Sequence, residues 1–600
     1  MDLITLDFET YYDTKISLRK LNTMEYVKHD MFKVQGVGIK INEDETYWYG
    51  ADETTEALEN INWSNAALLC HNTMFDGYIL THHYNLTPKY YFDTRAMSSG
   101  VWPGQSASLK DVAIRLYPFN NSMRKGEDLI KTKGVYDLPP DIEKTLGIYC
   151  IQDVDLTYQV YKDLLPSYPQ SELDLINLIC KMFCEPKLLI DRHRLEAYHK
   201  QEHLNAEKTI DDSGIDRKVL SSNQQFAEHI YSMGLVPPTK VSPTTGKDIP
   251  ALGKNDAGFT QMANMYPQFK HVWDARLAVK SRLSETRSKR LLDSANDDDT
   301  LPVPLRYYAA HTGRFGGTEK LNLQNMPRKS EIRKCLIAPH GHFVYVADLS
   351  QIEARMLAWL AGEDALLQQF RDGVDVYKAF ASIIYDKPIS KINEQERFVG
   401  KVAILGLGYG MGYKKFAMTL RAGAMGPAID FSDAQAKEVV DAYRTTYPNI
   451  KFLWSRLENL VKMSMHKDNY GHTLGPLTVA RHSLTLPNGM ALKYHGLHAT
   501  ADGLAYKSRG KPQYTYGGRI TENAIQALAR IIITDSMLRL AKQKDEHIVL
   551  QVHDEIIIIA TNTDPHATME RIIKDMCIAP SWCLDLPLAA EGGFDTSYSK

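Results

Sequence analysis

The stretches FVYVADLSQIEAR at 343–355 and HIVLQVHDEIIIIA at 547–560 decide the fold of the C-terminal half of this chain. In the first, an apolar β-like run ends at Asp348 and turns into a helical sequence. In the second, the triplet HDE separates two apolar runs, which predicts a hairpin whose turn presents carboxylates. Asp348 and Asp554 are therefore expected at strand ends, where two aspartates can clamp two metal ions for phosphoryl transfer.

A glycine-rich segment, ERFVGKVAILGLGYGMG at 396–412, lies between these two stretches. Arg397, Lys401 and Leu405 are four residues apart, so on a helix they form one stripe that ends near Tyr409. Two cations and an apolar side chain in this order suit a triphosphate and a base. A glycine costs about 1 kcal/mol in a helix interior, so the C-terminal half of the helix is predicted to be weak. A glycine-rich loop over a core is the alternative interpretation.

The N-terminus carries a second set of acids. Asp7 and Glu9 in LITLDFET leave the same face of the segment if it is a strand. Alone, the pair would be typical of a polar strand edge. However, Asp76 follows the apolar run ALLCHN, and Tyr149 precedes Asp153 by four residues, which puts phenol and carboxylate on one helix face. Acids that converge in this way are tolerable around a cation, and oxygen ligands suit Mg²⁺ or Mn²⁺.

The amino-acid composition excludes several classes of protein. The chain has 600 residues, 44% hydrophobic and 24% charged, which predicts three to five globular domains and excludes disorder, collagen and coiled coil for the whole chain. Its longest apolar runs are too short for a membrane helix. Seven cysteines without a CxxC pair and an acidic N-terminus without a signal sequence predict reduced thiols and a cytoplasmic location. With a net charge of −3, nucleic acid would have to be held by local basic patches.

The pattern along the chain alternates between strand-like and helix-like segments, which predicts a multidomain α/β and α+β protein. We expect strands at Leu3–Phe8, Val34–Ile41, Ala66–Cys70 and Phe343–Asp348, a β-rich patch at 476–496 and a hairpin at Ile548–Ala560. We expect helices at Ile148–Leu165, across 170–235, from about 350 to 465 and at Thr521–Lys542, with an exposed loop from Pro237 to Asp256 and a linker at Asp297–Asp299.

One predicted helix, Lys270–Arg290, is strongly basic. Its bases are Lys270, Arg276, Lys280, Arg282, Arg287, Lys289 and Arg290, against only Asp274 and Glu285. A solvated helix face is the ordinary explanation, but this excess in an acidic chain favours contact with phosphates. The candidate DNA contacts are Lys280, Arg282, Arg287, Lys289 and Arg290.

The N-terminal motifs resemble those of proofreading 3′–5′ exonucleases of the RNase H-like fold, in the subclass with a tyrosine before the last aspartate. The resemblance implies that Asp7, Glu9, Asp76 and Asp153 hold two divalent ions and that Tyr149 helps to orient the attacking water. In-line hydrolysis of a phosphodiester needs one metal to activate water and another to stabilise the departing 3′ oxygen.

The remainder resembles family A DNA polymerases, the class of bacterial DNA polymerase I and its phage relatives. DLSQIEAR is similar to motif A, Arg397–Gly410 to motif B and QVHDEI to motif C. Further matches are HTGRFGG at 311–317, NLQNMPR at 322–328 and ENAIQALAR at 522–530. The resemblance implies a right-hand palm, fingers and thumb behind the exonuclease, with no leading 5′-nuclease domain.

This resemblance implies five segments along the chain. They are an RNase H-like exonuclease domain at 1–165, connecting helices and thumb at 166–305, a first part of the palm at 306–365, fingers at 366–475, and the fingers-to-palm connection with the second part of the palm at 476–600.

The same resemblance assigns roles to single residues. Asp348 and Asp554 bind two Mg²⁺ or Mn²⁺ ions, with Glu555 beside them. Arg397 and Lys401 contact the incoming triphosphate, Tyr409 guards the template base, and Glu353 walls off the sugar 2′ position. Gln351, Tyr377 and Leu405 also border the nucleotide. Arg314, Gln526 and His553 match residues that touch the minor groove, where every base pair offers acceptors; the other candidate DNA contacts are Asn322, Gln324 and Asn325.

Two departures from the family pattern concern the nucleotide pocket. The family usually has an aromatic residue at Leu405 and often a histidine at Tyr377, so nucleotide discrimination stays open. A single-subunit RNA polymerase shares the palm motifs, but Glu353 and the exonuclease motifs argue against it. A non-catalytic scaffold is disfavoured by the intact carboxylates.

The implied activity is template-directed DNA synthesis with 3′–5′ proofreading, in phage or prophage replication. The implied partners are primer-template DNA, deoxynucleoside triphosphates and replisome proteins such as a helicase, a primase and a single-strand binding protein. We expect a monomer that works in the host cytoplasm. The sequence does not decide between replication and repair, and it gives no sign of strand displacement or of a processivity partner.

Overall fold

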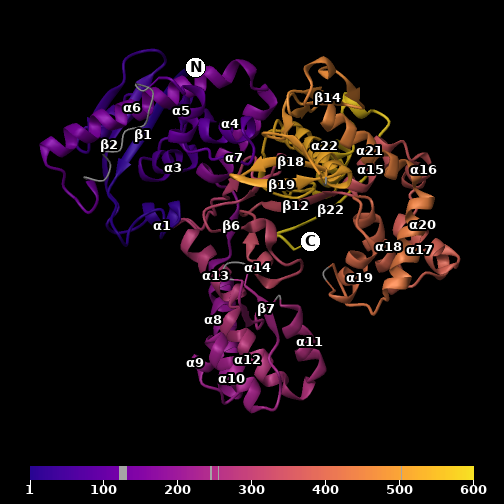
Figure 1. Ribbon diagram of the computed structural model, residues 1–600. Coiled ribbons are helices and arrows are strands. Elements are labelled where there is room, and N and C mark those ends of the chain that lie inside the picture. Colours follow the sequence, from indigo (N-terminus) through magenta and orange to yellow (C-terminus); the bar gives the residue numbers. More distant parts are fainter. Residues whose placement is uncertain (121–131, 243–245, 255, 424, 502, 600) are drawn as a thin grey trace. The chain divides into compact units, whose positions relative to one another are not determined.

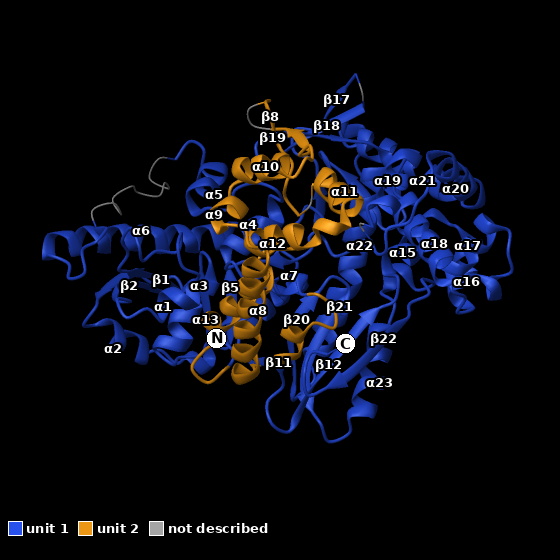
Figure 2. Ribbon diagram, turned by 90° about the horizontal axis from the view of Figure 1, so that it is seen from below, with its two compact units in different colours: residues 1–189, 300–326, 337–600 blue, residues 190–299, 327–336 orange. Residues whose placement is uncertain are grey.

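The computed structural model describes the chain except residues 121–131, 243–245, 255, 424, 502 and 600 (Figure 1). It separates into two compact units (Figure 2). The first comprises residues 1–189, 300–326 and 337–600, and the second comprises 190–299 and 327–336. Within the described residues, no helix is both long and apolar enough to cross a membrane.

The N-terminal part of the first unit is built on a mixed sheet of order β3-β2-β1-β4-β5. Its strands are β1 (Asp2–Thr10), β2 (Val34–Ile41), β3 (Tyr47–Gly50), β4 (Ala66–Cys70) and β5 (Tyr90–Asp93), which confirms the predicted apolar runs as strands. β1 is antiparallel to β2 and parallel to β4, which is parallel to β5. The carboxyl ends of β1, β4 and β5 therefore meet at one edge.

Helices cover this sheet. The predicted helix at 148–165 is the end of α6 (Pro140–Leu164), which packs against β1 and β2. The approach is close at Gly38 of β2, where a Cβ atom would lie 2.9 Å from Cys150 Sγ. α3 (Thr73–Tyr78) packs on β4 and β5, and α7 (Gln170–Cys184) packs on α3 and β5. The other α-helices among the described residues of this part are α1 (Thr23–Val27), α2 (Thr54–Glu59), α4 (Thr94–Val101) and α5 (Leu109–Leu116).

A second sheet, of order β20-β21-β12-β22, forms the C-terminal part of the first unit. Its strands are β12 (His342–Leu349), β20 (Glu546–Val552), β21 (Glu555–Thr561) and β22 (Ala590–Asp595). All neighbours are antiparallel, and the hairpin prediction is confirmed. The isoleucines of β21 are buried on both faces, which explains their continuous run. α22 (Gly517–Leu540) packs on β20 and β21, and α23 (Pro565–Met576) on β12 and β22.

The predicted helical region between these strands is confirmed as seven helices over the described residues. They are α15 (Ile352–Ala361), α16 (Asp364–Arg371), α17 (Val376–Tyr385), α18 (Glu394–Leu407), α19 (Tyr413–Arg421), α20 (Asp433–Thr446) and α21 (Pro448–Met463). Gly400 lets α17 approach α18, because a Cβ there would meet the Tyr377 carbonyl oxygen at 2.2 Å. α18 ends at Leu407, so Tyr409 lies beyond the helix.

Two small sheets follow. β13 (Thr473–Leu474), β14 (Leu477–Ala480), β15 (Ser483–Thr485) and β16 (Ala491–Lys493) confirm the β-rich patch. The other sheet, which the sequence did not predict, consists of β17 (His498–Thr500), β18 (Gly503–Ser508) and β19 (Lys511–Thr515).

The second unit is helical around a core that includes Phe226, Phe259 and Trp273. Its longer helices are α8 (Arg192–Asp212), α10 (Asn223–Ser232), α11 (Ala257–Met265), α12 (Lys270–Lys280) and α13 (Leu283–Ser294). The single helix predicted over 270–290 is wrong. Ser281 leaves the helical region at φ −134° and ψ 68°, and the two resulting helices pack separately on α8.

A buried ion pair joins α7 to α22 inside the first unit. Arg530 donates from both terminal nitrogens to the two carboxylate oxygens of Glu172, with an Nη2–Oε2 distance of 2.8 Å. The Tyr307 hydroxyl and Asn488 Nδ2 also donate to Glu172, the latter at 2.7 Å. Burial alone would raise the pKa of Glu172, but the Arg530 charge and these hydrogen bonds hold that pKa below its ordinary value.

We predict that Arg530→Met destabilises the protein by about 3–5 kcal/mol, because it leaves a buried carboxylate without its counter-charge. The double variant Glu172→Gln/Arg530→Met should recover much of the loss, since the neutral amide can still accept from Tyr307. Urea unfolding at pH 7 measures both effects. A double variant no more stable than Arg530→Met would show that the uncompensated charge is not the cause.

Candidate functional site

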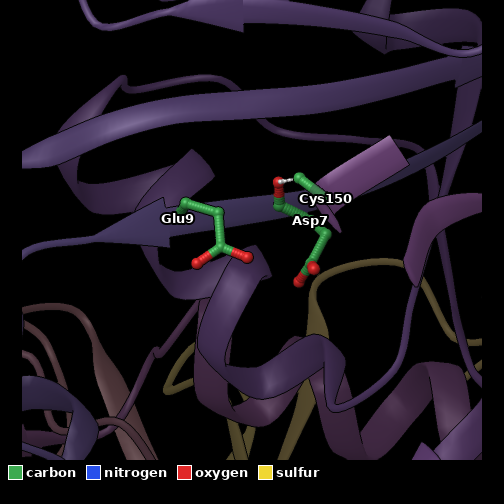
Figure 3. A group of neighbouring side chains, drawn as sticks. All are labelled: Asp7, Glu9 and Cys150. Atoms are coloured by element: carbon green, nitrogen blue, oxygen red, sulfur yellow. Dashed lines mark hydrogen bonds between the residues drawn. The ribbon is translucent and has the colours of Figure 1, made fainter. Parts of the chain in front are cut away.

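The first carboxylate cluster lies on β1. Asp7 and Glu9 direct their carboxylates to the same side of the strand (Figure 3). Ligand atoms of Asp7, Glu9 and Cys150 all lie within 4.8 Å of one another. The Cys150 thiol donates to the Asp7 carbonyl oxygen at 3.3 Å, which holds α6 against the strand. The predicted same-face pair is therefore present, with a cysteine neighbour that the sequence did not indicate.

The other two predicted acids of this cluster are buried on helices beside β1. Asp76 on α3 is 2% exposed and accepts a hydrogen bond from the Phe8 backbone nitrogen at 3.0 Å. Burial, and then the charge of Asp7, raise the pKa of Asp76 well above its ordinary value. Tyr149 and Asp153 lie one turn apart on the buried side of α6.

The donor chemistry of this cluster fits a hard divalent cation. Carboxylate oxygens are the ligands that Mg²⁺ and Mn²⁺ prefer. Cys150 does not fit as a ligand, because burial and the charges of Asp7 and Glu9 raise the pKa of its thiol and keep it protonated. Its adjacency to Tyr149 on α6 is the signal from which its position could have been predicted.

The second cluster lies at the β20–β21 turn and the end of β12. Asp348 on β12 is directly opposite Glu555 in the antiparallel register, so their side chains share a face. The Leu349 backbone nitrogen donates to the Asp554 carbonyl oxygen at 3.0 Å, which brings the two predicted aspartates onto neighbouring segments. Burial is the main cause that raises the pKa of Asp554, and the charge of Glu353 adds to it. Glu555 accepts a hydrogen bond from the Tyr598 hydroxyl.

The predicted cationic stripe is present on α18. Arg397, Lys401 and Leu405 are half-buried on a helix whose remaining side is mostly buried. Arg397 Nε donates to Asp375 Oδ2 at 2.7 Å, and its guanidinium lies 5.4 Å from the centre of the Tyr377 ring. The sequence reasoning missed Asp375, although an aspartate just before the helix in GVDVYKAFA is a typical N-cap signal.

Tyr377 connects this stripe to the second carboxylate cluster. Burial raises its pKa to about 12, and Arg397, Gln351 and Asp554 all lie close enough to influence it. Gln351 itself precedes α15 in the left-handed region, at φ 51°. Tyr377 thus lies close to two other predicted nucleotide-binding residues, Arg397 and Gln351, and to Asp554.

Glu353 on α15 is held by two partners. Arg314 Nη2 forms an ion pair with Glu353 Oε1, and the Tyr409 hydroxyl donates to Oε2 at 3.4 Å. Burial, and then Glu353, raise the pKa of Tyr409 well above its ordinary value. This network links three residues whose predicted roles concern the sugar, the template base and the minor groove.

Several predicted DNA contacts share one small cavity. Arg314, Gln324 and His553 line it together with Arg530 and Gln551. Gln324 Nε2 donates to the Gln551 carbonyl oxygen at 3.0 Å. Gln526 on α22 donates to Glu522 at 3.2 Å. Gln324 and Asn325 lie in the short helix Leu323–Asn325, and Asn322 caps its N-terminus.

The basic segment of the second unit is less available than its composition indicated. Arg276 is fully buried, and its guanidinium donates to the Leu220 carbonyl oxygen and to Asn223, so it cannot reach a phosphate. Arg282 pairs with Glu207 of α8 and with Glu285, and Lys289 lies 3.1 Å from Asp293. Glu207, distant in sequence, thus offsets part of the excess positive charge of this segment. Lys280 is exposed, and Arg287 and Arg290 are half-buried.

We predict that Asp76→Asn stabilises the ion-free protein at pH 8. The pKa of Asp76 is higher in the folded state than in the unfolded state. As the pH rises from the unfolded-state pKa to the folded-state pKa, the free energy of unfolding therefore falls. Asparagine keeps an acceptor for the Phe8 nitrogen without the charge. Thermal unfolding in EDTA should show a higher Tm for the variant at pH 8 and a vanishing difference near pH 4. An equal or lower Tm at pH 8 would contradict the role of charge repulsion.

Comparisons with known proteins assign the chain to a family. The family model described as DNA polymerase family A matches residues 192–600. The DNA polymerase of Bacillus phage SP02 is 25% identical over the whole of both chains, and that of Escherichia phage T5 is 23% identical over 87% of this chain and 66% of its own. DNA polymerase I of Pseudomonas aeruginosa is 26% identical over 53% of this chain, which covers only 32% of that relative.

The fold is also similar to a solved structure. That structure is described as the POL domain of Pol1 from M. smegmatis in complex with a DNA primer-template and dNTP. The TM-score is 0.66 at 19% identity, over 95% of this chain and 94% of that one. From the family match and the two phage relatives, we conclude that the chain belongs to DNA polymerase family A and is of the phage type.

Proposed function

We propose that this chain is a template-directed DNA polymerase that extends a primer 3′ end and removes mispaired ends with a 3′–5′ exonuclease. The observation that supports this most is the presence of two separate carboxylate clusters on two sheets, around Asp7 and around Asp554. One hydrolytic and one synthetic phosphoryl transfer each need such a cluster. A single site would serve only one of these reactions.

The proposed domain layout follows the sequence segments. Residues 1–165 form the RNase H-like exonuclease, 166–305 the connecting helices and thumb, and 366–475 the fingers. Residues 306–365 and 476–600 form the two parts of the palm. The helices of 190–299 form, together with residues 327–336, a compact unit separate from the rest of the chain, which suits a thumb.

In the polymerase site, Asp348 and Asp554 would hold two Mg²⁺ ions, which neutralise the triphosphate and activate the primer 3′ hydroxyl. Mg²⁺ is commonly bound by one or two carboxylates together with substrate phosphates, so two aspartates suffice. Arg397 and Lys401 lie on one helix face and bind the triphosphate oxygens. When the triphosphate binds, the Arg397 guanidinium leaves Asp375 and pairs with a phosphate. Because Asp375 already orients the guanidinium, the Arg397 side chain needs little further ordering.

In the exonuclease site, Asp7, Glu9, Asp76 and Asp153 would hold the ions, which supply an activated water for hydrolysis. Tyr149, one turn before Asp153 on α6, orients this water.

In the polymerase part, Arg314, Gln526 and His553 donate to acceptors in the minor groove, which every correctly shaped base pair presents. The full-length similarity to the SP02 polymerase supports a role in phage DNA replication.

We predict that the two activities separate. Asp7→Ala with Glu9→Ala should abolish degradation of single-stranded ends while primer extension survives, because only one cluster loses its ligands. Asp348→Ala should do the reverse. Loss of a metal ligand should reduce the affected rate by at least about 100-fold. Matched and mismatched primers with and without deoxynucleotides report both activities on one gel.

The control for folding is the circular dichroism spectrum of each variant. If either substitution set eliminated both activities in a folded protein, the assignment of two independent metal sites would be wrong.

We predict that Glu353→Ala raises the ratio of ribonucleotide to deoxyribonucleotide incorporation, because truncation removes the side chain that collides with a 2′ hydroxyl. Glu353→Gln is the matched control. It keeps the length and can still bond to Arg314 and Tyr409, so exclusion should persist. The ratio of kcat/KM values for the two nucleotides measures the effect. An unchanged ratio in Glu353→Ala would assign the exclusion to another residue.

A further inference from the structure

A basic cavity of about 830 Å³ lies in the first unit, beside the N-terminal sheet. Its lining includes Arg95, Lys110, Arg306 and Arg509, and none of its lining residues is an aspartate or glutamate. Segments distant in sequence supply these cations: α4, α5, β9 (Leu305–Arg306) and the β18–β19 turn. Clustered cations without lining acids make a site for an anion.

The cavity adjoins the edge of the sheet that carries the first carboxylate cluster. In the parallel register, Thr5 of β1 pairs with Leu69 of β4, and Cys70 pairs with Asp93 of β5. Along the chain, Asp7 follows Thr5 by two residues, Asn72 follows Cys70 by two, and Arg95 follows Asp93 by two. Asn72 and Arg95 both line the cavity. A chain of phosphates bound there would therefore lead to the carboxylates at the same sheet edge.

The three arginines keep their charge available to a ligand. Arg95 Nη1 donates to Asn72 Oδ1 at 2.7 Å, and Arg306 Nη2 donates to the Ala309 carbonyl oxygen at 3.2 Å. Among the described residues, none of Arg95, Arg306 and Arg509 forms an ion pair, and all three are exposed. Part of the Arg306 side chain is nevertheless shielded from solvent; this shielding, and then the charges of Arg509 and Arg95, lower the pKa of Arg306. The Arg306 guanidinium is thus repelled by the other two, and a bound anion would relieve this repulsion.

The walls of the cavity are held in place by hydrogen bonds. The Arg509 backbone nitrogen donates to the Gly104 carbonyl oxygen at 2.7 Å, and Lys493 Nζ donates to the Val101 carbonyl oxygen at 2.6 Å. His71 bonds Thr94 Oγ1 at 2.8 Å and the Ala107 carbonyl oxygen at 2.9 Å. The polymerase part therefore contributes directly to the cavity, and a hydrogen bond fixes the backbone that carries Arg509 before a ligand arrives.

We propose that this cavity binds the phosphodiester backbone of single-stranded DNA whose 3′ end reaches Asp7 and Glu9. The proposal rests on the proposed exonuclease function. Arg306 and Arg509 are its positioning residues from the polymerase part, and Arg95 is the one nearest the carboxylate edge. Guanidinium groups are suited to this task because they pair with phosphate oxygens through two parallel hydrogen bonds.

The test is the binding of a fluorescein-labelled oligo-dT strand to the full chain in EDTA, followed by anisotropy at several salt concentrations. Each phosphate contact to a single strand contributes about 0.7 to the slope of log affinity against log salt. Arg306→Gln/Arg509→Gln should therefore reduce the slope by about 1.4 and weaken binding at least about tenfold. Arg509→Lys should retain most of the slope, because the charge remains.

The matched control is Lys511→Gln, an exposed cation on the same hairpin that does not line the cavity. It should leave the affinity and the slope as in the wild type. Equal thermal unfolding of all variants shows that they fold. Unchanged binding by Arg306→Gln/Arg509→Gln, or an equal loss in Lys511→Gln, would overturn the proposal.

Two competitors separate a strand from a small anion. Inorganic phosphate and dTMP should displace the labelled strand far less well than unlabelled oligo-dT at equal phosphate concentration. Equal displacement would make the cavity a small-phosphate site and overturn the proposal. The binding assay contains no metal, so it is independent of hydrolysis. A protein that fails to digest single strands in Mg²⁺ refutes the exonuclease function, whereas digestion with unchanged variant binding refutes the cavity proposal alone.

Discussion

Repulsion between buried and half-buried carboxylates is the constraint on which the functional architecture depends. Asp7 and Glu9 share one side of β1, and the pKa of Asp76 beside them is raised by burial and by Asp7. Burial also raises the pKa of Asp554 in the second sheet. Such groups destabilise a fold unless a cation or a proton compensates them. A cation bound at each of the two carboxylate clusters would remove this repulsion.

The rest of the fold holds these edges rigid. Cys150 ties α6 to the Asp7 backbone, and Gly400 lets α17 and α18 pack closely enough to keep the cationic stripe in place. The Glu172–Arg530 pair connects α7, which covers the first sheet, to α22, which covers the second. Both carboxylate clusters thus lie in the first unit, and the interactions that stabilise this unit also hold the elements that carry them.

Local patterns predicted the strands and the acids at their ends. Period-two spacing placed Asp7 and Glu9 on one face, and an apolar run that ends in HDE predicted the hairpin of β20 and β21. Contacts between distant segments were not predictable in this way. Asp375 meets Arg397, and Glu207 meets Arg282, only after helices pack, and Arg276 is buried although its neighbours are basic. Charge counts along the sequence therefore overstated the cations that are free to meet DNA.

The most direct test of the central claim is a count of Mn²⁺ ions bound to the full chain, measured by electron paramagnetic resonance. The account predicts two independent classes of sites. Asp7→Ala/Glu9→Ala should remove one class and leave the other at its wild-type affinity, and Asp348→Ala/Asp554→Ala should do the opposite. Removal of all bound Mn²⁺ by either pair in a folded protein, or of none by both, would contradict the claim that each sheet edge is completed by its own cations.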